Sequence, residues 1–109
     1  MLRNQYQEAR QYLQKALSLV PEDGATQHDI GNCYHILGRL GKAIMHYRIA
    51  VRLQPLNPEL QNNIGTVLAK LGDIHQAKRH FEEALRLQPN FELARSNLIQ
   101  VRSILRSSE

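Results

Sequence analysis

The chain has 109 residues, of which 42% are hydrophobic and 22% are charged. These fractions are close to those of ordinary globular proteins, so they exclude a disordered chain, and the length allows one domain at most. The net charge of +4 raises an acidic protein or a nucleic acid as candidate partners.

No stretch approaches the ~20 apolar residues that span a membrane, and the N-terminal residues 1–5 are too polar to open a secretory signal. We therefore expect a cytoplasmic protein with no membrane interaction; export through a signal outside this sequence is the alternative. The single cysteine, Cys33, excludes an intramolecular disulfide.

Apolar residues recur at the i, i+3, i+4 spacing of a helix face, and no segment alternates like a strand. In the first helix this face consists of Tyr6, Ala9, Leu13, Ala16 and Leu17. Six helices are expected in chain order, at about residues 5–19, 25–37, 40–53, 58–71, 74–87 and 91–105. Breaks and caps are expected at Pro21, Gly38, Pro55, Asn57, Gly72, Asp73 and Pro89, and residues 106–109 should fray.

A repeat with an offset of 34 residues organises the chain. Twelve positions are identical between residues 24–57 and 58–91: Gln27/Gln61, Ile30/Ile64, Gly31/Gly65, Leu37/Leu71, Gly38/Gly72, Ala43/Ala77, His46/His80, Ala50/Ala84, Arg52/Arg86, Leu53/Leu87, Gln54/Gln88 and Pro55/Pro89. The single domain thus divides into the second half of a repeat (1–23), two whole repeats (24–57 and 58–91) and a terminal helix (92–109).

Small residues predict how the helices of each repeat pack. Gly31 and Gly65 lie in mid-helix, where Gly costs ~1 kcal/mol relative to Ala, so they are expected to permit close backbone approach. Tyr34, Tyr47 and Phe81 should fill the space beyond these contacts. In the last helix the equivalent position is Ile99, which would hold off a closely packed helix, so this helix is interpreted as a terminal cap.

The pattern resembles the tetratricopeptide repeat, a 34-residue helix–turn–helix with the signature W-x2-L-G-x2-Y, A-x3-F and a closing P. The first whole repeat matches it at Ile30, Gly31, Tyr34, Ala43, Tyr47, Ala50 and Pro55. The second matches at Ile64, Gly65, Ala77, Phe81, Ala84 and Pro89, while Gln27 and Gln61 replace the Trp. The resemblance implies an all-α solenoid of antiparallel helix pairs, a fragment of a right-handed superhelix.

The resemblance also implies a concave groove, lined by the first helix of each repeat, that binds an extended peptide. The predicted groove residues are His28, Asn32, His35, Asn62, Asn63, Thr66, Lys70, Asn97 and Gln100. Amide side chains suit this role because they can both donate to and accept from a peptide backbone.

Two specialised grooves of the family can be compared with these positions. Asn63 and Asn97 resemble the asparagine ladder in the repeats of the N-acetylglucosaminyl transferase that modifies nuclear and cytoplasmic proteins, although Asp29 breaks the ladder. Members that clamp a C-terminal carboxylate use Lys and Arg beside Asn. Asn32 and Asn63 match those asparagines, but non-cationic residues stand where the cations are expected, at His28, Leu93 and Asn97. The resemblance therefore argues against a carboxylate clamp.

No catalytic set or cofactor motif is present, so we expect neither an enzyme nor a cofactor. His28 and His35 are about 10 Å apart along a helix, too far to share a metal ion. His46 and His80 are expected on the outer face, and Cys33 is expected to be a buried, inert thiol. The basic residues of the second helices (Arg48, Arg52, Lys78, Arg79 and Arg86) would lie behind the groove, which disfavours nucleic-acid binding.

The leading hypothesis is a protein–protein interaction module. One alternative is a self-assembling module, because the first and last helices lack their partner helices within the repeat pattern. A homo-oligomer would then form by head-to-tail contact or by exchange of terminal helices. Another alternative is an accessory domain of a larger enzyme such as a glycosyltransferase.

Overall fold

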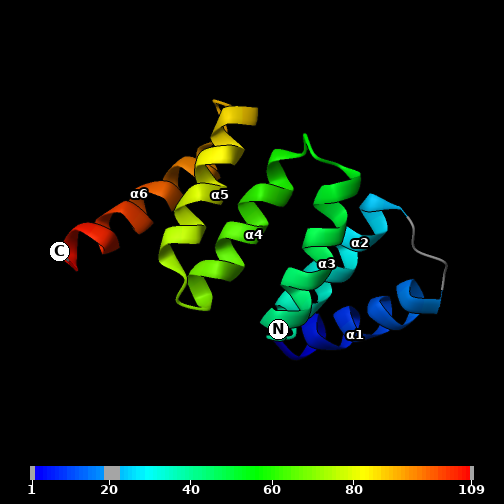
Figure 1. Ribbon diagram of the computed structural model, residues 1–109. Helices are drawn as coiled ribbons and strands as arrows, with labels where there is room; N and C mark the ends of the chain where they lie inside the picture. The colour runs from blue at the N-terminus through cyan, green and yellow to red at the C-terminus, as the bar shows by residue number, and fades with distance from the viewer. Residues whose placement is uncertain (1, 19–22, 109) are drawn as a thin grey trace. The chain divides into compact units, whose positions relative to one another are not determined.

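The computed structural model describes residues 2–18 and 23–108. These residues form six helices and no strand (Figure 1). The helices are α1 (Leu2–Ser18), α2 (Gly24–Ile36), α3 (Leu40–Leu53), α4 (Pro58–Lys70), α5 (Ile74–Leu87) and α6 (Glu92–Ser107). The expected all-α architecture is confirmed, and each predicted helix is present within a few residues of its expected bounds.

The helices fall into two compact units, Met1–Pro55 and Leu56–Glu109. In the first unit α2 packs against both α1 and α3. In the second unit α5 packs against both α4 and α6, and α6 also touches α4. Each unit thus consists of one whole helical hairpin, α2–α3 or α4–α5, with one additional helix against it.

The helix ends follow the predicted capping chemistry. The Asn57 side chain accepts hydrogen bonds from the backbone N–H groups of Glu59 and Leu60, and Asp73 accepts one from Gln76. Such caps satisfy donors that the first turn leaves without a helical partner. Gly38 and Gly72 have φ of 78° and 88°, the left-handed conformation predicted for a glycine after a helix.

The break at Pro21, and Leu19 before it, lie outside the described residues. Helix α6 does not fray after residue 105 but continues through Ser107. The hydroxyls of Ser107 and Ser108 donate to the carbonyls of Ser103 and Leu105, which provides partners for backbone acceptors in the last turn.

Close contact between a glycine and an aromatic ring joins the two helices of each hairpin. A Cβ atom on Gly31 would come within 2.5 Å of the Tyr47 ring, and one on Gly65 within 2.6 Å of the Phe81 ring. Both rings are buried, and a buried side chain of this kind contributes about 1.5–3 kcal/mol relative to an exposed one. The predicted close approach at both glycines is confirmed.

Small and branched residues complete each core. Ile30, Ala43 and Ala50 are buried in the first unit, and their repeat equivalents Ile64, Ala77 and Ala84 are buried in the second. On α1, Ala9 and Leu13 are buried, whereas Tyr6 and Tyr12 are 42% and 49% exposed. The side chains of Ala16 and Leu17 lie outside the described part of the chain. No helix among the described residues is long and apolar enough to cross a membrane.

Candidate functional site

A pocket of about 270 Å³ between α4 and α6 brings together four of the predicted groove residues, namely Thr66, Lys70, Asn97 and Gln100. They lie about one turn apart on each helix, so they project on the same side of the second unit. The other lining residues are Ala69, Phe81 and Val101, which form its apolar part. The sequence suggested Phe81 only as a packing residue, since its position in the repeat is the aromatic of the core.

Asn62 supports this pocket from inside the unit and does not line it. Its side chain is 2% exposed, and its Oδ1 accepts a hydrogen bond of 3.0 Å from Nδ2 of Asn97. The prediction that Asn62 faces the groove is therefore wrong. Because Asn97 donates one amide hydrogen to Asn62, its own Oδ1 is held in a defined orientation on the surface of α6.

The remaining predicted residues of α4 differ in what they can offer. The Thr66 hydroxyl donates to the carbonyl of Asn62 at 3.0 Å, so the Thr66 oxygen can accept a hydrogen bond from a ligand in the pocket. Lys70 is exposed in the last turn of α4, where a positive charge interacts favourably with the helix dipole. Asn63 is half-buried and is not among the residues that line the pocket.

On α2 the predicted residues His28, Asn32 and His35 are all half-buried. Oδ1 of Asn32 accepts a short hydrogen bond, 2.6 Å, from the Tyr47 hydroxyl, so it already has a partner within the first unit. Burial raises the pKa of Tyr47, which keeps this hydroxyl protonated and donating. The His28 ring lies edge-on to the Tyr47 ring, with 5.9 Å between centroids.

A second pocket, of about 400 Å³, lies between α1 and α2 in the first unit. Its lining includes Tyr12, Asp29, Asn32 and Cys33. The Tyr12 hydroxyl donates to Oδ2 of Asp29 at 2.9 Å, and this bond to the carboxylate, with its charge, raises the pKa of Tyr12. No sequence signal predicts this pair, because Tyr12 and Asp29 come from different helices and follow no common spacing.

Cys33 is 6% exposed, so its predicted burial is confirmed. Burial, with a smaller contribution from the charge of Asp29, raises the pKa of this thiol. The thiolate is the reactive form, so Cys33 is a poor nucleophile.

The repeated histidines are not on the outer face. Nδ1 of His46 lies 2.7 Å from Oε1 of Gln27, and Nδ1 of His80 lies 2.8 Å from Oε1 of Gln61. Both rings are half-buried. The glutamines that replace the family's Trp therefore hydrogen-bond the second helix of their own repeat. The prediction failed because helix periodicity was applied to each helix alone, whereas this position faces the neighbouring helix.

Within residues 2–18 and 23–108, no group of three His, Cys, Asp or Glu side chains could hold a metal ion. The two pockets described so far present amides, hydroxyls and a few charges, which is chemistry suited to recognition by hydrogen bonds.

Comparison with known proteins agrees with this architecture. The chain covers 72% of the Sgt2 TPR domain from Aspergillus fumigatus, with 97% of its own length, a TM-score of 0.84 and 18% identity. For the first TPR of Spaghetti (RPAP3) bound to the HSP90 peptide SRMEEVD, the TM-score is 0.81 and the identity 21%, over 94% of this chain and 86% of that one.

The second TPR domain of human RPAP3, in complex with the HSP70 peptide SGPTIEEVD, aligns with a TM-score of 0.71 and 21% identity, over 74% of this chain and 68% of that one. No curated protein sequence gives a significant match. Two family models for the tetratricopeptide repeat match residues 22–90 and 3–23. With helices, turns and glycine–aromatic contacts in the same register, the chain belongs to the tetratricopeptide repeat family.

Proposed function

We propose that this protein is a protein–protein interaction module that holds an extended segment of a partner on the face made by α4 and α6. The observation that carries this proposal is the pocket between these helices, in which the Asn97 amide is oriented by buried Asn62. A preoriented hydrogen-bonding group loses less freedom on binding, so more of its interaction energy contributes to affinity.

The polar side chains of the pocket match the chemistry of a peptide backbone. Asn97 Oδ1 can accept from a backbone N–H, and the exposed Gln100 amide can donate to a carbonyl. Ala69, which is small and half-buried, leaves room for one partner side chain between these contacts, above the buried Phe81 and Val101. On the first unit, we propose that His28 and His35 contact side chains of the partner.

Structures of similar fold support a peptide partner, since two of them hold the acidic chaperone peptides SRMEEVD and SGPTIEEVD. This chain differs at the positions where the family's carboxylate clamps carry cations, which here are His28, Leu93 and Asn97. We therefore propose an internal segment as the ligand, recognised through its backbone. A peptide with a C-terminal carboxylate and its amidated counterpart should bind equally well.

A photo-crosslinking amino acid at Gln100 tests the proposal without knowledge of the partner. Crosslinking in cell extract followed by mass spectrometry should identify one recurrent segment. The matched control places the same group at Arg79, which is exposed on α5. If Gln100 captures nothing beyond what Arg79 captures, the proposal fails.

The captured segment, made as a labelled peptide, then permits a double-mutant cycle. Loss of one hydrogen bond in Asn97→Ala should weaken binding about 3- to 10-fold. Asn62→Leu should weaken it as well, with little additional loss in the double variant, because Asn62 acts only through Asn97. Full additivity of the two effects would contradict this positioning role.

Self-assembly has one supporting observation of its own, the exposure of Tyr6 and Tyr12 on α1, of which Tyr12 lines the first-unit pocket. Aromatic residues are common anchors at interfaces between subunits. Light scattering over a range of concentrations distinguishes the two functions: a strict monomer at high concentration excludes self-assembly, and a dimer lost in Tyr12→Ser supports it.

A further inference from the structure

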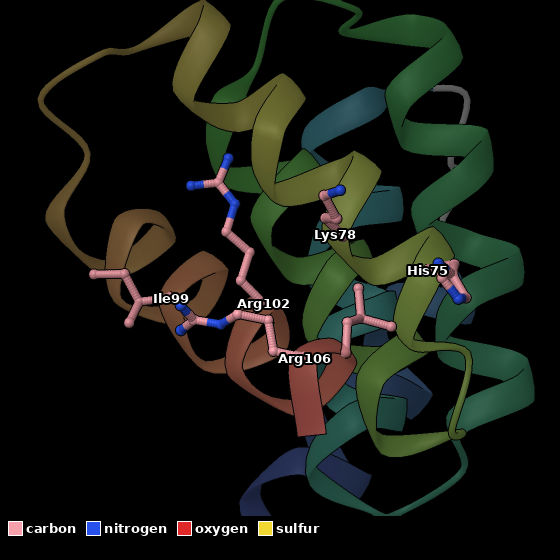
Figure 2. A pocket seen from close by; sticks show the side chains of 6 residues that line it. His75, Lys78, Ile99, Arg102 and Arg106 are labelled. Carbon is pink, nitrogen blue, oxygen red and sulfur yellow. The ribbon is translucent and has the colours of Figure 1, made fainter. Parts of the chain in front are cut away.

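A larger pocket, of about 530 Å³, lies between α5 and α6 and is separate from the proposed peptide site. Figure 2 shows its lining, with His75 and Lys78 on α5 and Ile99, Arg102 and Arg106 on α6. Leu105 of α6 completes it. The proposed function does not use any of these six residues.

The lining combines positive charge with apolar surface. Lys78, Arg102 and Arg106 are cationic, and none of the six residues is acidic. Arg102 has a carboxylate nearby, with Nη2 3.6 Å from Oε2 of Glu82, but both side chains are about half exposed, so this pair is weak. A single carboxylate against three cations leaves the pocket positively charged.

Ile99 supplies most of the exposed apolar surface, since it is 58% exposed, and Leu105 beside it is half-buried. A pocket with branched aliphatic side chains among cations fits an amphipathic ligand with apolar and acidic groups on neighbouring faces. An oligonucleotide would neutralise the charge but has no aliphatic side chain to cover Ile99, so nucleic acid fits less well.

The repeat register indicates the shape of this ligand. Ile99 is equivalent to Gly65 of α4, whose position is covered by Phe81 of α5. Arg95 is equivalent to Gln61 of α4, and Gln61 contacts His80, which is also on α5. The face of α6 that borders the pocket is thus the face on which the other first helices receive a packed helix.

The side chains on this face alter the packing distance and the charge that such a helix would need. At Ile99 the side chain prevents the close contact made at Gly65, so a docked helix would lie at an ordinary separation of about 8–10 Å. Arg102 and Arg106 stand at the positions of Leu68 in α4 and Gly72 in the turn after it, which adds two cations that the first helix of the α4–α5 hairpin lacks there.

We propose that the α5–α6 pocket docks an acidic amphipathic helix of a partner protein. Its apolar residues would cover Ile99 and Leu105, and its carboxylates would pair with Lys78, Arg102 and Arg106. A second copy of this chain is a poorer occupant. Its α1 carries Arg10 and Lys15 against Glu8 and would bring like charge to the pocket.

The probes are two synthetic helical peptides with the same leucine stripe, one flanked by glutamates and one by lysines. Fluorescence anisotropy should give a Kd below about 100 μM for the acidic peptide and no saturable binding for the basic one. Salt should weaken the binding, since part of it comes from exposed charges. Amide chemical shifts should change on α5 and α6.

Variants locate the site and separate it from the peptide groove. The double variant Arg102→Glu/Arg106→Glu should lower affinity for the acidic peptide at least about tenfold, whereas Arg48→Glu, exposed on α3, should not. Ile99→Asp should also abolish binding. Asn97→Ala should leave it unchanged, so failure of one site does not imply failure of the other.

Three outcomes would overturn the inference. The first is equal binding, or no binding, of both peptides to the intact chain. The second is tighter binding of a single-stranded oligonucleotide than of the acidic peptide, if Arg102→Glu/Arg106→Glu abolishes the oligonucleotide binding. The third is a dimer seen by light scattering that Ile99→Asp dissociates, which would assign the pocket to a second copy.

Discussion

The hairpins α2–α3 and α4–α5 use the same contacts between their helices but carry different side chains beside them. Gly31 faces Tyr47 in the first, and Gly65 faces Phe81 in the second. The extra hydroxyl of Tyr47 is bonded to Asn32, whereas Phe81 has no polar atom and the residue equivalent to Asn32 is Thr66. The same glycine–aromatic packing therefore accommodates a hydrogen-bonding Tyr in one hairpin and an apolar Phe in the other.

The positions that join the helices of a hairpin are distinct from the positions that its surface leaves for recognition. Positions that join the helices, such as the Gln27–His46 and Gln61–His80 pairs, are identical in the two hairpins. Exposed or half-exposed positions beside them are free to vary without loss of the fold. We expect recognition to differ between the hairpins while their stabilities depend on the same contacts, and the following changes test this view.

The largest effect is expected at the glycines. In Gly31→Ala the new methyl group meets the Tyr47 ring, which its hydroxyl bond to Asn32 holds in place, so the free energy of unfolding should fall by about 2 kcal/mol. Gly65→Ala should lower the free energy of unfolding by less, because Phe81 has no such hydrogen bond and its ring can shift. Gly41→Ala is the control, since a Cβ there meets nothing within 4 Å. Urea titration measures all three, and equal stabilisation by all three would contradict close packing.

Exchange of the aromatic residues sharpens the comparison. Tyr47→Phe removes a hydrogen bond from a fully buried ring and should cost about 1 kcal/mol. Phe81→Tyr should lower the free energy of unfolding about as much, because Thr66 has no amide oxygen in the place where Asn32 Oδ1 accepts from Tyr47. Addition of Thr66→Asn should recover most of that loss by recreating the bond found in the first hairpin. A double variant no more stable than Phe81→Tyr alone would show that the hairpins are not interchangeable here.

The pH dependence of stability gives a smaller effect. Burial, and secondarily the charge of Lys42, lowers the pKa of His46. The unfolded chain then binds a proton more readily near pH 6.5, so the contribution of neutral His46 is complete above this pH and is lost as pH falls through its lower folded pKa. His46→Gln should flatten the unfolding free energy between pH 7.5 and 5.5. His75→Gln, at an exposed position, is the control and should not flatten it.

The smallest effect is expected where the hairpins differ on the surface. Arg86 pairs with Glu83 at 2.5 Å, whereas the equivalent residues of the first hairpin are Arg52 and Ile49. Both side chains of the pair are substantially exposed, so Glu83→Ile should leave the urea midpoint of unfolding unchanged within measurement error. A midpoint that is clearly lower, and stays lower at high salt, would show that the ion pair contributes to the fold.

Sequence reasoning predicted the helices and their packing because these depend on local rules. The 34-residue offset, the glycines and the caps at Asn57 and Asp73 each have a direct conformational meaning. The site was harder, because a rotation of 100° per residue gives the side of a helix but not the depth of a side chain. Asn62 and Asn63 are adjacent in sequence, yet Asn62 is buried and bonded to Asn97, whereas Asn63 is half-buried.

No spacing rule predicts a contact between two helices when the contacting residues are not related by the repeat. The Tyr12–Asp29 bond depends on how α1 lies on α2, and the α5–α6 pocket depends on how α6 brings Arg102 and Arg106 next to Lys78 of α5. The sequence contained one usable signal for this pocket. Ile99 stands where both whole repeats have Gly, so its side chain prevents a helix from packing on α6 as closely as α3 and α5 pack on α2 and α4.

The buried thiol of Cys33 has a practical consequence for spectroscopy. It is the sole cysteine of the chain, and its raised pKa leaves little thiolate at neutral pH. A cysteine introduced at an exposed position should therefore react with maleimide dyes or spin labels much faster than Cys33. Pairs of labels for distance measurements can then be attached without removing a native side chain from the core.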